Sequence, residues 1–226
     1  MKLAHKIITT YPAIPFVAPF ATFILVLAFK EILPLPITWQ YPPLVLIVIG
    51  VVLVIFPSVE APSRAYGSIV VGLLVFVVWI LPDLLWPSYR EHWLFKNLLT
   101  GAAESSLPVS IRSNPTFLIF RIFGTAVLVP VVEELFWRGW LMRYLISVDF
   151  RKVPLGTYSA ASYWFTAALF ATEHGSFWDV GFVAGLIYNA WMIRTRNLSD
   201  CMLAHGTTNL CLALFVVLGG HWQYWL

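Results

Sequence analysis

Two adjacent carboxylates, Glu133 and Glu134, lie inside an apolar stretch and are followed four residues later by Arg138. An ionised side chain inside a bilayer costs about 2.5–3.5 kcal/mol on insertion scales, so such residues indicate function. Residues four apart share a helix face, which predicts that Arg138 pairs with Glu134. Glu133 then points about 100° away and is free to act as a general base in a cavity. The alternative is a structural Glu–Arg pair, which leaves the second carboxylate unexplained.

Two histidine clusters follow the acidic pair. Phe170 precedes His174 by one helical turn, and its ring is expected to form a wall of the pocket around the imidazole. His205 precedes Asn209 by the same spacing, and two donors aimed at one point would stabilise an oxyanion. A histidine alone in an apolar segment is more often a satisfied core residue, and His205 could instead be a metal ligand. The three clusters together, in one half of the chain, indicate a shared chemical site.

Composition places these residues in a membrane. The 226-residue chain is 60% hydrophobic and 11% charged, whereas a soluble domain carries about 25% charged residues. Most of its surface must therefore face a lipid bilayer. The net charge of +3 is small and the basic residues are scattered, which excludes a nucleic-acid-binding protein.

The apolar runs predict an all-α fold, a polytopic transmembrane helical bundle of about seven spans (six to eight). Residues 87–114 are the most polar stretch and are predicted to form an interfacial amphipathic helix. We expect a single membrane domain, in which residues 1–114 supply N-terminal helices as an apolar jacket and residues 115–220 form the catalytic core. The seven runs are residues 11–29, 43–56, 66–86, 115–146, 157–174, 178–193 and 198–218.

The distribution of Lys and Arg predicts the orientation. With the N-terminus in the cytoplasm, cytoplasmic segments hold eight of these residues, Lys2 and Lys6 among them, and the opposite side holds four. This orientation places His205 near the cytoplasmic end of its span and His174 at the far end of its own. For the two to meet, the helix that ends at His174 must stop inside the membrane, or the spans must tilt strongly.

The three clusters, in this order on successive apolar segments, resemble the three motifs of the CPBP family. This family comprises the type II CAAX prenyl endopeptidases and their prokaryotic relatives, also called the abortive-infection family. The resemblance covers roughly residues 115–218, and the Gly181-x-x-x-Gly185 step is also similar to the family pattern. The matching motifs are Glu133-Glu134-x-x-x-Arg138, Phe170-x-x-x-His174 and His205-x-x-x-Asn209.

The resemblance implies intramembrane endoproteolysis and a role for each motif residue. Glu133 would be the catalytic base, with Glu134 and Arg138 as its supporting pair. His174 would position or activate water. His205 and Asn209 would stabilise the oxyanion.

Two catalytic classes remain open, a metal-free glutamate protease and a zinc enzyme. Zinc catalysis needs about three protein ligands and an open position for water, and Glu133, His174 and His205 could supply the ligands. The His-Glu-x-x-His pattern, which places two ligands and a base on one helix, is absent from the sequence. We therefore favour activation of water without a cofactor, with zinc as the second choice.

The expected partner is a membrane-tethered peptide or protein substrate, and the expected location is a bacterial inner or plasma membrane. One alternative is a non-proteolytic scaffold or immunity-type protein, in which the polar clusters only hold helices together. Another is a proton-coupled transporter, since buried Glu, Arg and His are typical of such proteins. The sequence lacks the paired, interrupted helices of an inverted repeat, which weakens the transporter interpretation. The Trp-rich C-terminal tail is interpreted as an interfacial aromatic belt.

Overall fold

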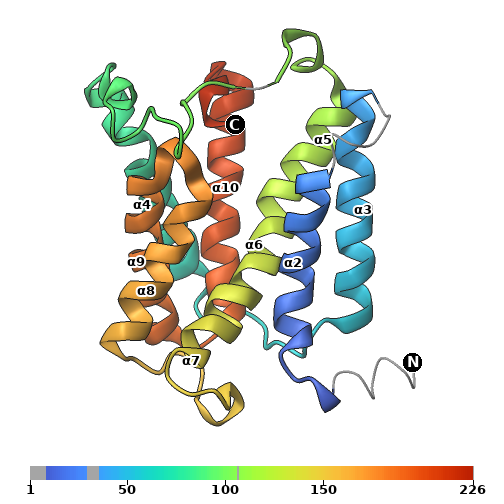
Figure 1. Cartoon of the computed structure of the whole chain (residues 1–226), viewed down its shortest axis with the longest axis vertical. Coiled ribbons are helices and arrows are strands. Elements are labelled where there is room, and N and C mark those ends of the chain that lie inside the picture. Colours follow the sequence, from blue (N-terminus) through green and yellow to red (C-terminus); the bar gives the residue numbers. More distant parts are fainter. Residues whose placement is uncertain (1–8, 30–35, 106, 226) are drawn as a thin grey trace.

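Helices form the regular secondary structure of the chain in the computed structural model, which describes residues 9–29, 36–105 and 107–225 (Figure 1). Within these residues the only β contact is an isolated antiparallel bridge between Asn97 and Gly101. The all-α prediction is therefore confirmed. Lys2 and Lys6, on which the predicted orientation partly rests, lie outside the described residues.

The long helices follow the apolar runs of the sequence. The first three are α2 (Ile14–Phe29), α3 (Ile37–Ile55) and α4 (Ala65–Leu85). The next is a continuous helix, Pro115–Tyr144, made of α5 (Pro115–Phe123), a π-helical turn (Gly124–Leu128), α6 (Val129–Glu134), a second π-helical turn (Leu135–Leu141) and α7 (Met142–Tyr144). The last three are α8 (Ala160–Ala171), α9 (Trp178–Thr195) and α10 (Leu198–Gly219).

Local capping explains where three of these helices begin. The side chains of Asn114, Ser159 and Asn197 each accept a hydrogen bond from a backbone N–H in the first turn of α5, α8 and α10, respectively. Such caps satisfy donors that a helix N-terminus leaves without partners. Pro115 occupies the first turn of α5, where its missing N–H costs nothing.

Within the part of the chain that the structure describes, three helices are long and apolar enough to cross a bilayer: α4, the Pro115–Tyr144 helix and α10. Helix α2 and the Tyr41–Ile55 part of α3 are shorter apolar helices. Large hydrophobic side chains such as those of Leu53 and Leu218 are about four-fifths exposed, as expected for a surface that faces lipid. The chain is thus an integral membrane protein, and its span count of about seven stays a prediction.

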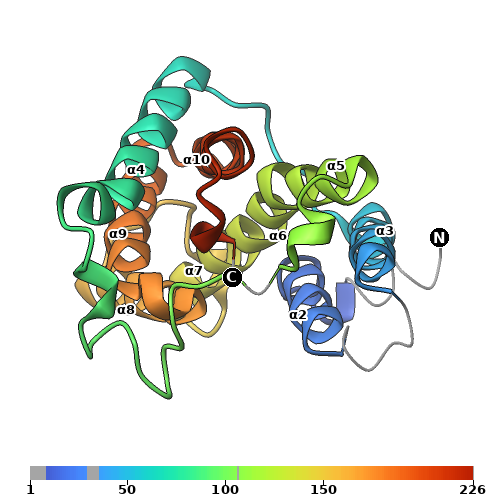
Figure 2. The ribbon, with the colours of Figure 1, turned by 90° about the horizontal axis from the view of Figure 1, so that it is seen from above.

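Helix α10 lies between α4 and the Pro115–Tyr144 helix (Figure 2). Its approach to α4 is close, because a methyl group at Gly72 would collide with the carbonyl oxygen of Ala204. The hydroxyl of Thr208 donates to the carbonyl oxygen of Gly72 over 2.8 Å. Helix α4 therefore packs directly against the helix that carries His205, and the division of the chain into a jacket and a catalytic core stays a prediction.

The prediction of an amphipathic helix within residues 87–114 is wrong. The described part of this stretch contains only short 3-10 turns, at Tyr89–Glu91 and Val109–Ile111, and the isolated bridge. The buried side chain of Arg90 holds the stretch against the bundle. It donates to Asp83 over 2.9 Å, to Asp179 over 2.5 Å and to the carbonyl oxygen of Ser176 over 2.7 Å. The two contacts with Ser176 and Asp179, more than 80 residues away in sequence, outweigh the helical spacing of the apolar residues.

The interruption predicted near His174 is present. Helix α8 has only 12 residues, or about 18 Å at 1.5 Å per residue, which is shorter than a bilayer core of about 30 Å. A 3-10 turn, Thr172–Phe177, follows, and Gly175 within it has φ +50° and ψ −121°. Positive φ is readily adopted by glycine, so the chain reverses there into α9.

Candidate active site

Glu134 forms the centre of a buried polar cluster. Its Oε1 atom accepts a hydrogen bond from Nη1 of Arg138 over 3.0 Å, as the four-residue spacing predicts. The same oxygen accepts a hydrogen bond from Nδ1 of His205, over 2.9 Å. Glu134 and Arg138 are fully buried. The Glu134 carboxylate therefore links the Pro115–Tyr144 helix to α10.

The guanidinium of Arg138 has hydrogen-bond partners for its N–H groups and aromatic rings near its Cζ atom. Its Nε donates to Oδ1 of Asn189 over 3.0 Å, and its Nη2 donates to the carbonyl oxygen of Gly185 over 3.2 Å, both on α9. The rings of Phe170 and Tyr188 lie 4.8 and 5.5 Å from its Cζ atom, within the range of cation–π contacts. A buried cation with this many partners fixes the relative positions of three helices.

Glu133 differs from its neighbour in what surrounds its carboxylate. It is 7% exposed and lines a cavity that Glu134 does not reach. Its Oε2 atom is buried and has no hydrogen-bond partner. The Oε2 atom of Glu134 is also buried without a partner, but that carboxylate is held through its Oε1 atom by Arg138 and His205. The position of Glu133 at the cavity is therefore what distinguishes it as a candidate reacting group.

His174 presents one ring nitrogen to the cavity. Its Nδ1 atom is 2.9 Å from the carbonyl oxygen of Phe170. A carbonyl oxygen only accepts, so Nδ1 carries the proton and Nε2 has the lone pair. The rings of Trp79 and Phe170 pack against the imidazole at 5.1 and 4.8 Å. A side chain at Gly181 would crowd Nδ1, at 3.0 Å, so this glycine makes room for the ring.

His205 and Asn209 face the same cavity from α10. The ring of His205 stacks on Tyr188 with centroids 5.0 Å apart and an interplanar angle of 25°. Tyr188 is held in turn by its hydroxyl, which donates to Thr208 over 2.7 Å. One N–H of the Asn209 amide donates to the carbonyl oxygen of Thr125 over 2.8 Å. The second N–H and the ring Nε2 of His205 are left for a ligand.

A cavity of about 190 Å³ brings these groups together. His174 and His205, predicted to be at different depths, both line it and both pack against the ring of Phe170. The shared-site geometry is thus consistent with the short helix α8. The lining residues are Trp79, Arg121, Thr125, Val129, Glu133, Phe170, His174, Tyr188, His205, Thr208, Asn209, Leu212, Tyr224 and Trp225.

The three residues proposed as zinc ligands share a cavity without forming a ready-made metal site. Glu133, His174 and His205 line one cavity, but among the described residues no three His, Cys, Asp or Glu side chains are arranged to hold a metal ion. His205 also donates its Nδ1 proton to the carboxylate of Glu134, as metal-bound histidines do toward outer carboxylates. The choice between a metal-free site and zinc therefore stays a prediction.

Sequence reasoning missed several residues of the site. Asn189 and Tyr188 on α9 hold Arg138 and His205, and the only signal near them was the glycine step ending at Gly185. Tyr224 and Trp225 were assigned to an interfacial aromatic belt, but they are 8% and 4% exposed and line the cavity. The C-terminal tail therefore closes the site instead of facing lipid.

Comparison with known proteins agrees with the geometry. The sequence model of the family described as type II CAAX prenyl endopeptidase Rce1-like matches residues 115–211. No curated protein and no solved structure matches the chain. The matched segment begins at the first residue of α5 and contains all three polar clusters, up to Asn209. Residues 115–211 are therefore similar to the Rce1-like family of type II CAAX prenyl endopeptidases, which are generally intramembrane proteases.

Proposed function

We propose that this protein is an intramembrane endopeptidase that hydrolyses a peptide bond in a membrane-associated protein or peptide. The observation that carries the proposal is the shared cavity. Glu133, His174, His205 and Asn209 come from three separate helical segments and line one buried space. A scaffold needs no such convergence, since polar groups that only hold helices together end in contacts with one another. The Oε2 atom of Glu133 and the Nε2 atom of His174 make no such contact with another polar group of the described residues.

Two acceptors are available to hold the attacking water. The Glu133 carboxylate has an oxygen without a partner. The Nε2 lone pair of His174 is free because Nδ1 donates to the Phe170 carbonyl oxygen. A water bound to both through its two protons would direct an oxygen lone pair at a substrate carbonyl. Glu133 takes one proton as the C–O bond forms, and later gives it to the leaving amine as the C–N bond breaks.

The developing oxyanion is assigned to the donors on α10. Asn209 has one N–H free after its contact with Thr125. In its imidazolium form His205 also donates through Nε2, while its Nδ1–H group continues to donate to the carboxylate of Glu134. The carboxylate of Glu134 fixes the orientation of the ring, and Arg138 fixes the carboxylate. Donors held rigidly toward a developing charge lower the barrier without reorganisation.

The test compares two glutamates. Membranes from the native host carrying Glu133→Gln should accumulate an unprocessed protein or peptide that the wild type cleaves, detected by quantitative mass spectrometry of the membrane proteome. Glu104→Gln, at an exposed glutamate, should process it normally. Full processing by a folded Glu133→Gln protein would overturn the proposal and favour the scaffold. Proton flux in liposomes without substrate would favour a transporter.

We also propose a bacterial plasma membrane location with a cytoplasmic N-terminus. The support is the excess of Lys and Arg in the segments assigned to the cytoplasm. Reporter fusions placed after α2 and after α4 test the orientation, because a cytoplasmic N-terminus puts the α2–α3 loop and the residue 87–114 stretch on the outer side. Cytoplasmic signals from both fusions would overturn it.

A further inference from the structure

Arg121 is a cation of the cavity that the proposed hydrolysis does not use. It lies on α5 and lines the same space as Glu133. Among the described residues its guanidinium takes part in no salt bridge, and its Nε atom is buried without a hydrogen-bond partner. The buried arginines Arg90 and Arg138 are both paired with carboxylates. An unpaired cation at membrane depth is costly, so Arg121 is a candidate binding group for an anion.

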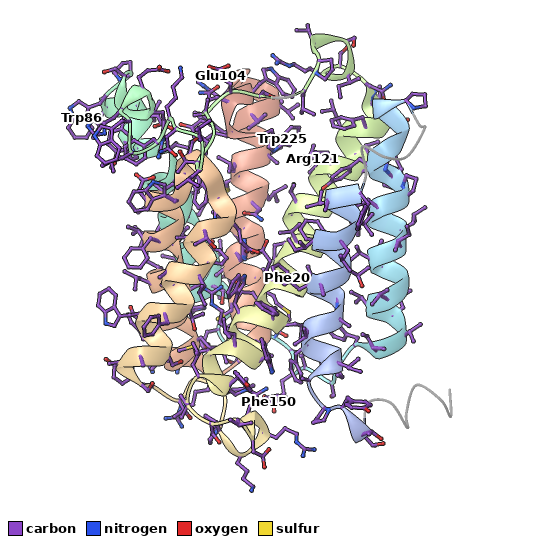
Figure 3. The ribbon with its side chains drawn as sticks, in the orientation of Figure 1. Phe20, Trp86, Glu104, Arg121, Phe150 and Trp225 are labelled. Carbon is purple, nitrogen blue, oxygen red and sulfur yellow. The ribbon has the colours of Figure 1, made fainter. Side chains whose placement is uncertain are left out.

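Aromatic rings hold the Arg121 guanidinium in place. Its Cζ atom lies 4.9 Å from the ring centroid of Tyr41 on α3 and 5.5 Å from that of Trp225 in the C-terminal tail. Figure 3 shows Arg121 and Trp225 close together toward one end of the bundle. Rings contact a guanidinium through its flat faces and leave the N–H groups at its edge free. That planar edge matches a carboxylate through two parallel hydrogen bonds.

The π-helical turn Gly124–Leu128 aims Arg121 and Glu133 into the same cavity. Twelve residues of regular α-helix would leave the two side chains about 120° apart around the axis. A π-helical turn accommodates about one extra residue, which removes about 100° of that difference. Thr125 and Val129, at the intervening four-residue steps, line the cavity as well. The unpaired cation Arg121 and the proposed catalytic base Glu133 therefore lie on the same face of the helix.

We propose that Arg121 binds a carboxylate of the substrate and thereby sets where the chain is cut. The proposal rests on the proposed endopeptidase function. The carboxylate is either the C-terminal α-carboxylate of the substrate or an acidic side chain. With one residue taken up by the π-helical turn, Arg121 and Glu133 are separated by about 16–17 Å along the helix, at 1.5 Å per residue. An extended peptide covers this distance in about five residues, so the cut falls about five residues from the anchored carboxylate.

A substrate carboxylate fits this position better than a lipid phosphate does. Arg121 lies six residues into its helix, or about 9 Å below the helix start. The tail residues Tyr224 and Trp225 also line the cavity beside it and are buried. A phosphate at headgroup depth would have to displace this tail, whereas an extended peptide that reaches Glu133 passes Arg121 on the way.

Binding is measured with the full chain carrying Glu133→Gln in bicelles, so that no cleavage interferes. The probes are a decanoylated octapeptide of alternating alanine and leucine with a free C-terminal carboxylate, the same peptide as its C-terminal amide, and the amide with glutamate as its last residue. We expect a carboxylate probe to bind about tenfold more tightly than the plain amide, as a charge-assisted hydrogen bond provides. Preference for the free acid or for the glutamate probe identifies the source of the carboxylate.

Arg121→Gln should remove the difference between probes and Arg121→Lys should retain part of it. Arg151→Gln removes one exposed positive charge elsewhere and should leave the difference unchanged. Equal binding of all three probes by the protein with Arg121 intact overturns the proposal, whatever the enzyme cleaves. Dependence on Arg121 only for binding of anionic phospholipid overturns it as well. With Glu133 intact, mass spectrometry of the cleaved probe should place the cut about five residues from the carboxylate, and a cut at an unrelated position overturns the anchoring role.

Discussion

The Nδ1 atom of His205 lies 2.9 Å from Oε1 of Glu134, across 71 positions of sequence. Arg138 donates to the same oxygen from one turn away. Glu133, the immediate neighbour, has no comparable partner and faces the cavity. Adjacent residues of identical type thus occupy opposite environments, one inside a closed network and one open to a ligand. The two glutamates should respond differently to the same substitution.

Glu134→Gln should destabilise the protein strongly, because it leaves the fully buried Arg138 without its counter-charge. Removal of one partner from a buried pair costs about 3–5 kcal/mol. Glu133→Gln removes a buried carboxylate that has no partner, so stability should be unchanged or higher while cleavage is lost. Thermal unfolding of both variants in detergent checks the contrast. Equal unfolding temperatures for the two would contradict the division between Glu133 and Glu134.

His174→Phe tests the ring nitrogen separately from the ring packing. Phenylalanine keeps an aromatic ring between Trp79 and Phe170 but provides no Nε2 acceptor. We expect cleavage to fall by about 10²- to 10⁴-fold, the usual contribution of a positioned acid or base. The measurement is the single-turnover rate on a substrate identified by the proteomic comparison. A rate within twofold of wild type would show that His174 only fills space.

Gly185→Ala should separate α8 from α9. Its added Cβ would lie 3.0 Å from the backbone Cα of Ala167, and Gly185 also provides the carbonyl oxygen that accepts from Arg138. Overpacking of this kind costs about 1–3 kcal/mol. Gly50→Ala is the matched control, because nothing lies within 4 Å of its added methyl group. In α3 that change should stabilise the helix by about 0.5–1 kcal/mol. Chemical denaturation of both variants tests the opposite signs.

Removal of metal should leave cleavage unchanged. The cavity residues Glu133 and His174 are proposed to hold water directly, and the described residues provide no three-ligand set for a metal. Activity after prolonged dialysis against 1,10-phenanthroline should equal that of the untreated protein. Loss of activity that returns on addition of zinc would establish the metal-dependent alternative, with Glu133, His174 and His205 as its ligands.

Much of the fold follows from local sequence patterns. The apolar run 66–86 predicts α4 within one residue, because a lipid-facing helix is apolar over its whole length. The pair formed by Glu134 and Arg138 is equally local, since one helical turn determines it. The stretch 87–114 was predicted wrongly because ionic contacts of Arg90 with Asp83 and Asp179 determine its path.

Contacts between helices account for what the sequence did not reveal about the site. No local pattern distinguishes Asn189 from the other polar residues of its helix. Only the packing of α9 against the Pro115–Tyr144 helix places Asn189 beside Arg138. For the C-terminal tail the sequence pattern is misleading, because aromatic residues near a chain end are typical of an interfacial belt. Burial of Trp225 beside Arg121 depends on the tail folding back over the cavity.

The partners of Arg138 are made at different times during synthesis. Glu134 is on the same helix, so the two opposite charges can neutralise each other as soon as that helix forms in the translocon. The acceptors on Gly185 and Asn189 leave the ribosome about fifty residues later, and His205, the second partner of Glu134, leaves later still. The ion pair therefore lets the most polar helix enter the membrane before the chain that completes its network exists. Under the proposed mechanism, Glu134 thus serves insertion of the helix and Glu133 serves cleavage of the substrate.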